Sequence, residues 1–285
     1  MTQVTGGRLG HRWVTMLVLA SCPLSSMAAQ QGDDLERERH EYAAWLATAP
    51  LSPFALLRIQ PVGDGISIGR EPSDIPLPGI GRGMAREEGT VVVFRRDSNR
   101  VVLPRGRPVP VGAFTLIASG LPGRSVIAAF GAVRGFAPPT WFPPAPGFDL
   151  TLTLQPGGRR EAFRILGPDG TDVEAHEAGF IQVARAGGST RLRVYRVPGD
   201  EADETELLIY FRDSTSGHGS YPAGRFVTLT PAGSERYRLD FNRARNPFCA
   251  YSSAFPCPAP WPGNTIPFSV EAGEQYHGGE PRSAP

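Results

Sequence analysis

The chain has 285 residues, a formal net charge of +1 and an apolar fraction of 40%, which suits a folded protein with a sizeable core. A charge so near zero provides no clustered basic excess for nucleic acid or an anionic membrane surface, so we exclude both as partners. All 29 basic side chains are arginine, and the missing lysines exclude a P-loop lysine, a Schiff base and a Ser-x-x-Lys nucleophile.

The first 29 residues have the order of an export signal. Two arginines precede an apolar run over residues 13–20, and a small-residue segment over 25–29 follows it. The apolar run is shorter than a membrane-spanning helix, so we expect no transmembrane helix once the signal is removed. We therefore predict a periplasmic or secreted protein.

The exported product has two alternative forms, a free chain and a lipid-anchored chain. Cleavage after Ala28 or Ala29 would release a free chain. Residues 19–22 also resemble a bacterial lipobox, in which Cys22 would be lipidated and would anchor the protein to a membrane surface. Pro23, directly after Cys22, favours the free product.

One amphipathic helix is predicted over residues 33–48. Apolar side chains, among them Tyr42 and Leu46, recur at roughly helical spacing between charged residues. Asp33 or Asp34 is expected to cap its first turn.

Beyond the helix, short β-branched or aromatic runs alternate with turn residues. Examples of the predicted strands are residues 90–94, 101–103, 114–118, 126–130, 148–154, 180–184, 192–197, 207–211, 226–229 and 266–270. Because crossover helices are missing, these runs predict a mainly β fold: an antiparallel sandwich or barrel-like domain, with the helix across one opening or face. We predict a single β-rich domain over 30–276 and a flexible tail over 277–285.

Residues 66–78 contain a Gly-Arg step followed by Asp-Ile, and in this they resemble the first signature of forkhead-associated phosphothreonine readers. The Ser-Arg-x-His step that such readers use against phosphate is absent from the residues that follow. We therefore interpret this segment as a β-hairpin with a Gly/Pro turn.

The proline-rich run over residues 137–146 has two interpretations. Its composition is typical of a linker or a polyproline ligand. Trp141 and Phe142 within it are large apolar side chains that favour burial, so we predict a rigid loop docked inside the domain.

Metal ligation by histidine has no support in the sequence. His40, His176, His218 and His277 show no i, i+4 pair and no Cys-x-x-Cys companion, so we predict no metal and no cofactor. A Gly-x-Ser-x-Gly nucleophile elbow is also missing.

The densest motifs lie near the C-terminus. They are the segments 211–226, 239–251 and 255–260, then Asn264, and finally Glu-Ala-Gly-Glu over 271–274. With these motifs in this order, the chain resembles the domain of unknown function 1684 family. The resemblance implies an organised C-terminal site or a structural cross-link, without an established activity.

Small departures from the family pattern occur at three positions. Ser220 stands where the family commonly has threonine, Ala259 interrupts a Pro-Leu-Pro-Pro run, and Gly263 replaces an acid before Asn264. These departures affect single contacts rather than membership.

Two cysteines remain after the signal is removed and Cys22 is set aside. Cys249 and Cys257 are an even pair in an oxidising compartment, which predicts a disulfide. A pair of buried thiols is the alternative.

Asp240 and Asn242 lie two residues apart at a predicted strand end, so their side chains share one face while Leu239 and Phe241 face the core. Such a pair can hold a ligand. It can also satisfy the backbone of the loop that follows, because Asp and Asn commonly bond local N–H groups.

The polar residues near the C-terminus are expected to converge beneath the Cys249–Cys257 loop, because buried polar groups are costly unless they find partners. The predicted binding or structural polar centre consists of Asp213, Tyr221, Arg225, Asp240, Asn242, Asn246, Asn264, Glu271 and Glu274. In this centre Arg225 can pair with Asp213 or Asp240, or bind an anionic ligand bidentately.

These features predict a ligand-binding or structural role in the periplasm or cell envelope. The alternative is a hydrolase that uses carboxylates among Asp213, Asp240, Glu271 and Glu274. A pocket that gathers those acids beside Arg225, with a strongly raised pKa in one of them, would favour the enzyme. Side chains engaged with loop backbone would favour the structural role.

Overall fold

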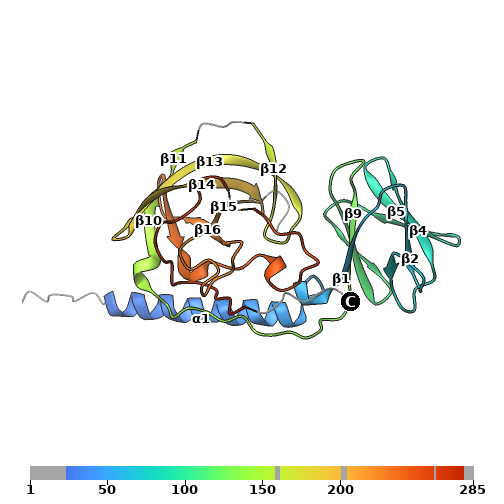
Figure 1. Cartoon of the computed structure of the whole chain (residues 1–285), viewed down its shortest axis with the longest axis horizontal. Helices are drawn as coiled ribbons and strands as arrows, with labels where there is room; N and C mark the ends of the chain where they lie inside the picture. Colours follow the sequence, from blue (N-terminus) through green and yellow to red (C-terminus); the bar gives the residue numbers. More distant parts are fainter. Residues whose placement is uncertain (1–23, 158–160, 200–203, 260, 279–285) are drawn as a thin grey trace, which may run out of the picture.

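The computed structural model describes residues 24–157, 161–199, 204–259 and 261–278, and its strands form two lobes (Figure 1). The small lobe, residues 56–130, carries β1 to β9; the large lobe carries β10 to β17. Helix α1, Leu24–Thr48, runs along the large lobe towards the small one. The predicted class, a mainly β fold with one N-terminal helix and a barrel-like sheet, is confirmed.

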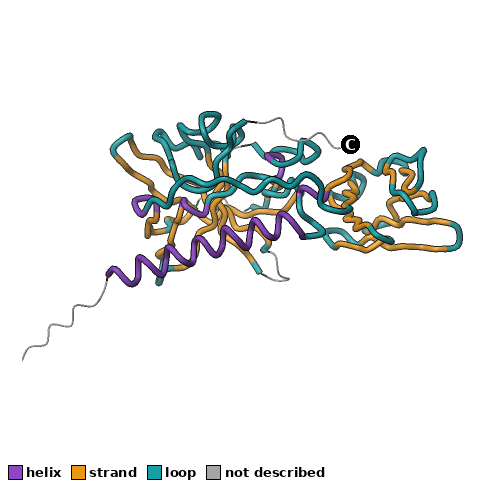
Figure 2. Tube along the Cα trace, turned by 90° about the horizontal axis from the view of Figure 1, so that it is seen from below, coloured by secondary structure: helices purple, strands orange, loops and turns teal. Residues whose placement is uncertain are grey.

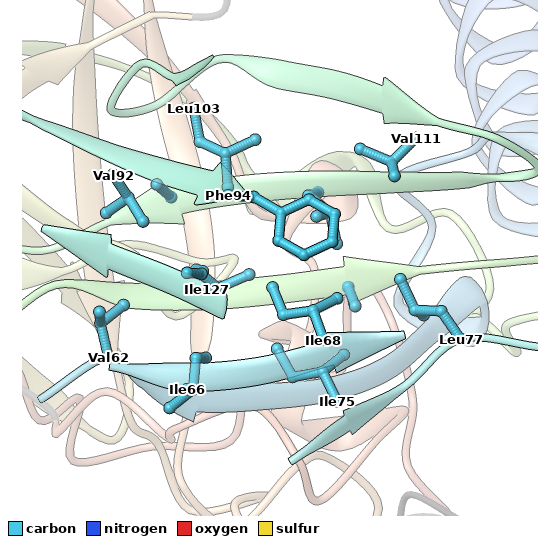
Figure 3. Packing of buried hydrophobic residues seen from close by; sticks show 14 of the residues in the cluster. Val62, Ile66, Ile68, Ile75, Leu77, Val92, Phe94, Leu103, Val111 and Ile127 are labelled. Carbon is cyan, nitrogen blue, oxygen red and sulfur yellow. The ribbon is translucent and has the colours of Figure 1, made fainter. Parts of the chain in front are cut away.

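The small lobe is a sandwich of two sheets. One has the order β1-β9-β8-β7 and the other β3-β2-β4-β5-β6. Their bounds are β1 Leu56–Pro61, β2 Ile66–Gly69, β3 Ile75–Pro76, β4 Gly83–Glu88, β5 Val91–Arg96, β6 Asn99–Leu103, β7 Pro108–Val111, β8 Phe114–Ser119 and β9 Val126–Phe130. Their inner faces enclose an apolar core that includes Ile68, Phe94 and Ile127 (Figure 3).

The hairpin predicted over residues 66–78 is wrong. β2 and β3 are paired in parallel, with Ile68 opposite Ile75. The loop between them is held by Asp74, whose carboxylate accepts hydrogen bonds from the backbone N and the Oγ of Ser67, both at 2.7 Å. Leu77 N donates to Gly69 O and continues the parallel pairing, so the chain crosses over instead of turning back.

The large lobe contains one antiparallel sheet that curves into a nearly closed barrel (Figure 1). Its order is β10-β17-β16-β15-β14-β13-β11, with β12 also paired to β13. The bounds are β10 Asp149–Thr153, β11 Gln155–Pro156, β12 Phe163–Leu166, β13 Asp172–Arg185, β14 Gly188–Pro198, β15 Thr205–Phe211, β16 Arg225–Pro231 and β17 Arg236–Asp240. Short 3-10 helices are η1 Pro53–Ala55, η2 Pro146–Phe148, η3 Phe241–Arg243 and η4 Phe248–Ala250.

Irregular chain fills the inside of this curved sheet. Residues 261–278, here called the C-terminal segment, enter the core with Ile266, Phe268 and Val270 packed against the inward side chains of the strands. Residues 266–270 were predicted as a strand, and that assignment is wrong. They alternate between buried and exposed like a strand, but the only ladder-type contact described nearby is an isolated bridge of Thr265 to Arg212.

Helix α1 crosses the open side of the large lobe (Figure 2). Its buried positions are Leu35, Arg39, Tyr42 and Leu46, a spacing that places them on one face. The helix begins at Leu24, so Asp33 and Asp34 lie inside it and do not cap it, contrary to prediction. None of the described helices is long and apolar enough to cross a membrane.

The apolar run of the predicted export signal and Cys22 lie outside the described residues, as do most residues of the predicted tail. Export, lipidation and the tail therefore stay predictions.

A third apolar cluster joins the two lobes. It combines Leu56 and Phe130 of the small lobe with Tyr221, Cys249 and Phe255 of the large lobe. Each lobe has a core of its own as well, so the proposed boundary of a single domain over 30–276 stays a prediction.

Candidate functional site

The predicted site residues lie in and around the C-terminal segment, but they do not form one hydrogen-bonded centre. The described contacts divide them into groups around Arg225, Asp240, Glu274, Asn264 and the disulfide, of which the Arg225 and Glu274 groups meet at the carbonyl of Glu274. Each group joins irregular chain to regular structure.

Arg225 begins β16 and is almost completely buried, with 1% of its surface exposed. Of the two carboxylates considered as partners, it pairs with Asp213, at 2.9 Å from Nη2 to Oδ2. The same guanidinium donates to three alternate carbonyls of the C-terminal segment, those of Val270, Ala272 and Glu274. Burial lowers the pKa of Arg225, while the charge of Asp213 opposes this shift.

Asp213 receives donors on both carboxylate oxygens. Oδ2 accepts from Arg225 and from the backbone N of Val270, at 2.9 and 3.0 Å. Oδ1 accepts from Thr215, through its backbone N at 3.0 Å and its Oγ1 at 2.7 Å. A carboxylate with both oxygens occupied in this way has no exposed lone pair for a substrate proton.

Asp240 and Asn242 hold the chain where β17 passes into η3. Asp240 Oδ1 accepts from the backbone N and the Nδ2 of Asn242, at 3.0 and 2.8 Å. Asn242 in turn bonds both backbone groups of Ala145, in the proline-rich loop. Of the two roles considered for this pair, these contacts match the one that satisfies local backbone.

Two arginines that the sequence did not single out complete the Asp240 group. Asp240 Oδ2 accepts from Arg238 at 3.1 Å and also from Arg243. Arg238 is bidentate to Asp149 on β10, and Arg243 is bidentate to Glu38 on α1. The network therefore ties the helix and two strands together. The sequence feature that could have indicated this network is the pair of arginines that flanks Asp240, two residues before it and three after it.

Glu274 is the most perturbed acid among the predicted site residues. It is 1% exposed, and burial raises its pKa from 4.5 to about 7. Its Oε2 accepts from the backbone N of Asn246 at 2.9 Å, and its Oε1 accepts from Tyr251 Oη at 2.5 Å.

The Glu274 group reaches helix α1 through two tyrosines. Tyr251 Oη lies 3.1 Å from Tyr42 Oη, and Arg245 lies over the Tyr42 ring at 4.0 Å. Burial raises the pKa of both tyrosines. The Oδ1 of Asn246 is buried without a hydrogen-bond partner among the described residues.

Asn264 is fully buried and bridges two strands of the large lobe. Its side chain accepts from Arg193 N at 2.8 Å and donates to the carbonyls of Arg193 and Tyr210, both at 3.0 Å. The direct pairing of β14 with β15 begins at Tyr195 and Leu208. Asn264 therefore supplies hydrogen-bond partners to the backbone of Arg193 and Tyr210, which lie just beyond that pairing.

The predicted disulfide between Cys249 and Cys257 is confirmed, with the Cα atoms 5.5 Å apart. Tyr221 Oη lies next to it, at 3.2 Å from Cys249 O and 3.3 Å from the sulfur of Cys257. This group lies in the apolar cluster that joins the lobes.

Glu271 stands apart from the other acids and is exposed. In the alternating stretch around it, Val270 and Ala272 are buried, so Glu271 faces outward. It does not join Asp213, Asp240 or Glu274 in a shared acid pair.

The proline-rich loop docks onto the C-terminal segment. Phe142 N donates to Gly273 O at 2.9 Å, and Arg39 donates to Phe142 O at 3.3 Å. Trp141 packs edge-on against Tyr42. Among the described residues no group of three His, Cys, Asp or Glu side chains is placed to hold a metal ion.

Together, the fold and these contacts define a mainly β protein in which buried polar side chains hold an irregular segment inside a curved antiparallel sheet. Residues 134–275 match the model of the family described as a protein of unknown function (DUF1684), and the chain belongs to that family. The match covers the proline-rich loop, the large-lobe sheet and most of the C-terminal segment. The small lobe lies outside it.

Comparison with solved structures finds a similar chain, the solution NMR structure of an uncharacterized protein from gene locus rrnAC0354 of Haloarcula marismortui. The two chains are 32% identical over 49% of this chain and 77% of that chain, with a TM-score of 0.42. No curated protein matches.

Proposed function

We propose that this protein is an exported, non-catalytic binding or structural domain of the periplasm or cell envelope. The observation that carries the proposal is the Asp213–Arg225 pair. Both side chains are buried, and their hydrogen bonds go to each other, to Thr215 and to the backbone of the C-terminal segment. Groups engaged in this way stabilise a framework and leave no free donor for a substrate.

Two features support the export part of the proposal. Residues 8–29 have the basic, apolar and small-residue order of a signal. The disulfide between Cys249 and Cys257 suits an oxidising compartment. Intact-mass measurement of the protein from a periplasmic fraction tests this part. A chain starting near Ala29 or Gln30 is expected, a diacylglycerol-modified Cys22 would establish the lipid-anchored form, and a retained Met1 would contradict both.

The second candidate is a carboxylate-dependent hydrolase acting on an envelope or extracellular substrate, and the raised pKa of Glu274 favours it. A carboxyl with a pKa of about 7 suits a general acid at neutral pH. Against this role, both Glu274 oxygens already hold internal donors, and the side chain is buried beneath Tyr251 and Tyr42.

A hydrolysis assay separates the two candidates. The purified protein and its Glu274→Gln variant would be incubated with chromogenic esters, glycosides and phosphate monoesters. The proposed role predicts no turnover above the buffer control with either protein. Turnover by the wild type that disappears in Glu274→Gln would overturn the proposal and establish the hydrolase.

A further inference from the structure

One end of the small-lobe sandwich opens into a cleft of about 380 Å³, a volume within the range of small-molecule sites. The β5–β6 hairpin forms one wall with Phe94, Arg96 and Asn99. The other sheet forms the opposite wall with Val111 and Gly112. The cleft therefore lies where the two sheets separate, at the edge of the apolar core.

Successive side chains of β5 point to opposite faces of the sheet, and this places Arg96 on the face that lines the cleft. Val92 and Phe94 point into the core, and Arg96 follows them on the same face of the strand. Asn99 is its direct partner across the hairpin, and both residues line the cleft. Arg95, one residue earlier, faces the other way.

The positive charge of Arg96 is not neutralised within the lobe. Arg95 is bidentate to Glu88, with bonds of 2.9 to 3.1 Å, whereas Arg96 makes no ion pair with any described residue. Its side chain lies across Gly81, where a Cβ would come within 3.0 Å of the Arg96 Cδ. Gly81 therefore leaves the space in which the guanidinium stem rests.

The surroundings of the cleft are positive as well. Arg100 also lines it, although it is paired with Glu88 at 3.5 Å, and no carboxylate is among the lining residues. Residues 56–130 carry ten arginines and six carboxylates, a net charge of +4, against +1 for the whole chain. Positive charge thus gathers in the lobe that contains the cleft.

The floor of the cleft is apolar. Phe94 on β5 and Val111 on β7 belong to different sheets, and Figure 3 shows both among the core side chains. Both line the cleft, together with Ile80. We propose that this cleft binds a small organic anion, whose carboxylate or phosphate is held by Arg96 and Asn99 and whose compact apolar body rests against Phe94 and Val111. The inference deepens the ligand-binding part of the proposed function and rests on it.

An NMR titration of the isotope-labelled exported chain tests the inference. The probes are phenyl phosphate, benzoate, inorganic phosphate and the uncharged benzyl alcohol. Phenyl phosphate or benzoate should shift the Asn99 side-chain amide and the Gly112 backbone amide. The preferred probe shows whether the anion is a phosphate or a carboxylate. Benzyl alcohol and inorganic phosphate should bind at least 10-fold more weakly, because each lacks one half of the recognised chemistry.

A matched pair of arginine variants tests the geometry. Arg96→Gln should weaken binding of the preferred probe about 10-fold, the loss of roughly one charge-assisted contact. Arg95→Gln removes the same charge from the opposite face of the same strand and should change the affinity less than 2-fold. Asn99→Asp, which places a negative charge at the mouth, should also weaken binding.

Three results would overturn the inference: no shifts at Asn99 or Gly112 at millimolar probe, equal losses in the Arg95 and Arg96 variants, or equal binding of benzyl alcohol. None of these results would show hydrolysis, and turnover in the hydrolysis assay would leave the cleft titration unchanged. A failure of the anion-binding inference can therefore be distinguished from a failure of the proposed non-catalytic function.

Discussion

The two lobes differ in the kinds of side chain that they bury. The small-lobe core is built almost entirely of apolar side chains, and of the buried polar residues only Ser67 and Ser125 belong to that lobe. Apart from Ser52, which caps η1, the large lobe and its helix hold the others, including Arg39, Asp213 and Arg225.

The difference follows from the kind of chain that fills each interior. In the small lobe, regular strands face one another, so their backbone groups are already paired within the sheets. The large lobe encloses the C-terminal segment and the loop after β17, whose N–H and C=O groups find few partners in regular structure. Arg225, Asp213 and Asp240 supply those partners. Buried polar residues in this family segment therefore indicate enclosed irregular chain as readily as a catalytic site.

The largest effect is expected from breaking the buried ion pair of the large lobe. Asp213→Ala should lower the free energy of unfolding by about 3–5 kcal/mol, because Arg225 would stay buried without its counter-ion. Urea unfolding followed by tryptophan fluorescence measures this loss, since Trp45, Trp141 and Trp261 lie on or in the large lobe, and far-UV circular dichroism follows the small lobe, which contains no tryptophan. The small-lobe control, Arg95→Gln, breaks an exposed pair and should cost less than about 1 kcal/mol.

A double variant sharpens the same test. Asp213→Ala combined with Arg225→Met should cost less than the sum of the two single changes, because each single change leaves a buried partner unpaired. Additive losses would mean that the pair does not act as a unit. A loss from Asp213→Ala no greater than that from Arg95→Gln would remove the contrast between the lobes.

The next effect is a pH dependence from Glu274 in the large lobe, opposite in sign to the one expected of the small-lobe acids Asp74, Glu87 and Glu88, whose pKa values their hydrogen bonds lower. Burial raises the pKa of Glu274 from 4.5 to about 7, so the folded protein binds this proton more tightly than the unfolded chain. The contribution is therefore most favourable below pH 4.5 and is lost as the pH rises to about 7. At 1.36 kcal/mol per pKa unit, the loss is about 3 kcal/mol.

The Glu274→Gln variant isolates this contribution, because glutamine does not titrate. Urea unfolding of both proteins from pH 4.5 to 7.5 gives the difference between their free energies of unfolding. The wild type should lose about 3 kcal/mol relative to the variant across that window. A flat difference curve would place the Glu274 pKa in the folded protein near its ordinary value.

The disulfide ranks below these two effects. It closes a short loop, with a sequence separation of 8, and short loops gain least from a cross-link, so Cys249→Ala combined with Cys257→Ala should cost roughly 2–3 kcal/mol. Urea unfolding measures the cost. Because the bridge lies where the lobes meet, the small-lobe amides near Phe130 should also gain hydrogen exchange. Labelling of two free thiols in the denatured, unreduced wild type would show that the bridge is absent.

The sequence was most informative where a pattern acts locally. The strand predicted over 126–130 has the bounds of β9, because a β-branched run between turn residues is a local signal. The strands β1, β4 and β17 were not predicted, since arginine, glutamine or glutamate interrupts their apolar residues. The wrong hairpin over 66–78 has a different cause: the antiparallel partner of β2 is β4, which lies beyond those residues, and β3 pairs with the other edge of β2 in parallel.

The site was harder to predict than the fold. The expectation that polar residues among apolar neighbours must be buried and find partners was correct for most of the predicted site residues, from Asp213 to Glu274. It could not assign their partners, because the carbonyls that Arg225 binds come from a segment about 50 residues away. The alternation of apolar and polar residues before Glu271 did predict which way its side chain faces. With Ile266, Phe268 and Val270 inward, Glu271 had to face out.

The smallest effect tests whether the Asp240 group is framework or site. Asp240→Asn keeps the size of the side chain but loses its charge, and one of its two polar atoms becomes a donor that faces either Asn242 or the arginines. We expect a loss of roughly 1–3 kcal/mol in the free energy of unfolding, the scale of a charge-assisted hydrogen bond. Asp172→Asn, in the exposed pair with Arg164, is the matched control and should cost less than about 1 kcal/mol. A framework residue should show its loss in the free protein and with any bound probe alike. If Asp240→Asn instead left the free protein unchanged and altered only the stabilisation by a ligand, the large lobe would hold a binding site after all, and the contrast with the small lobe would fail at that point.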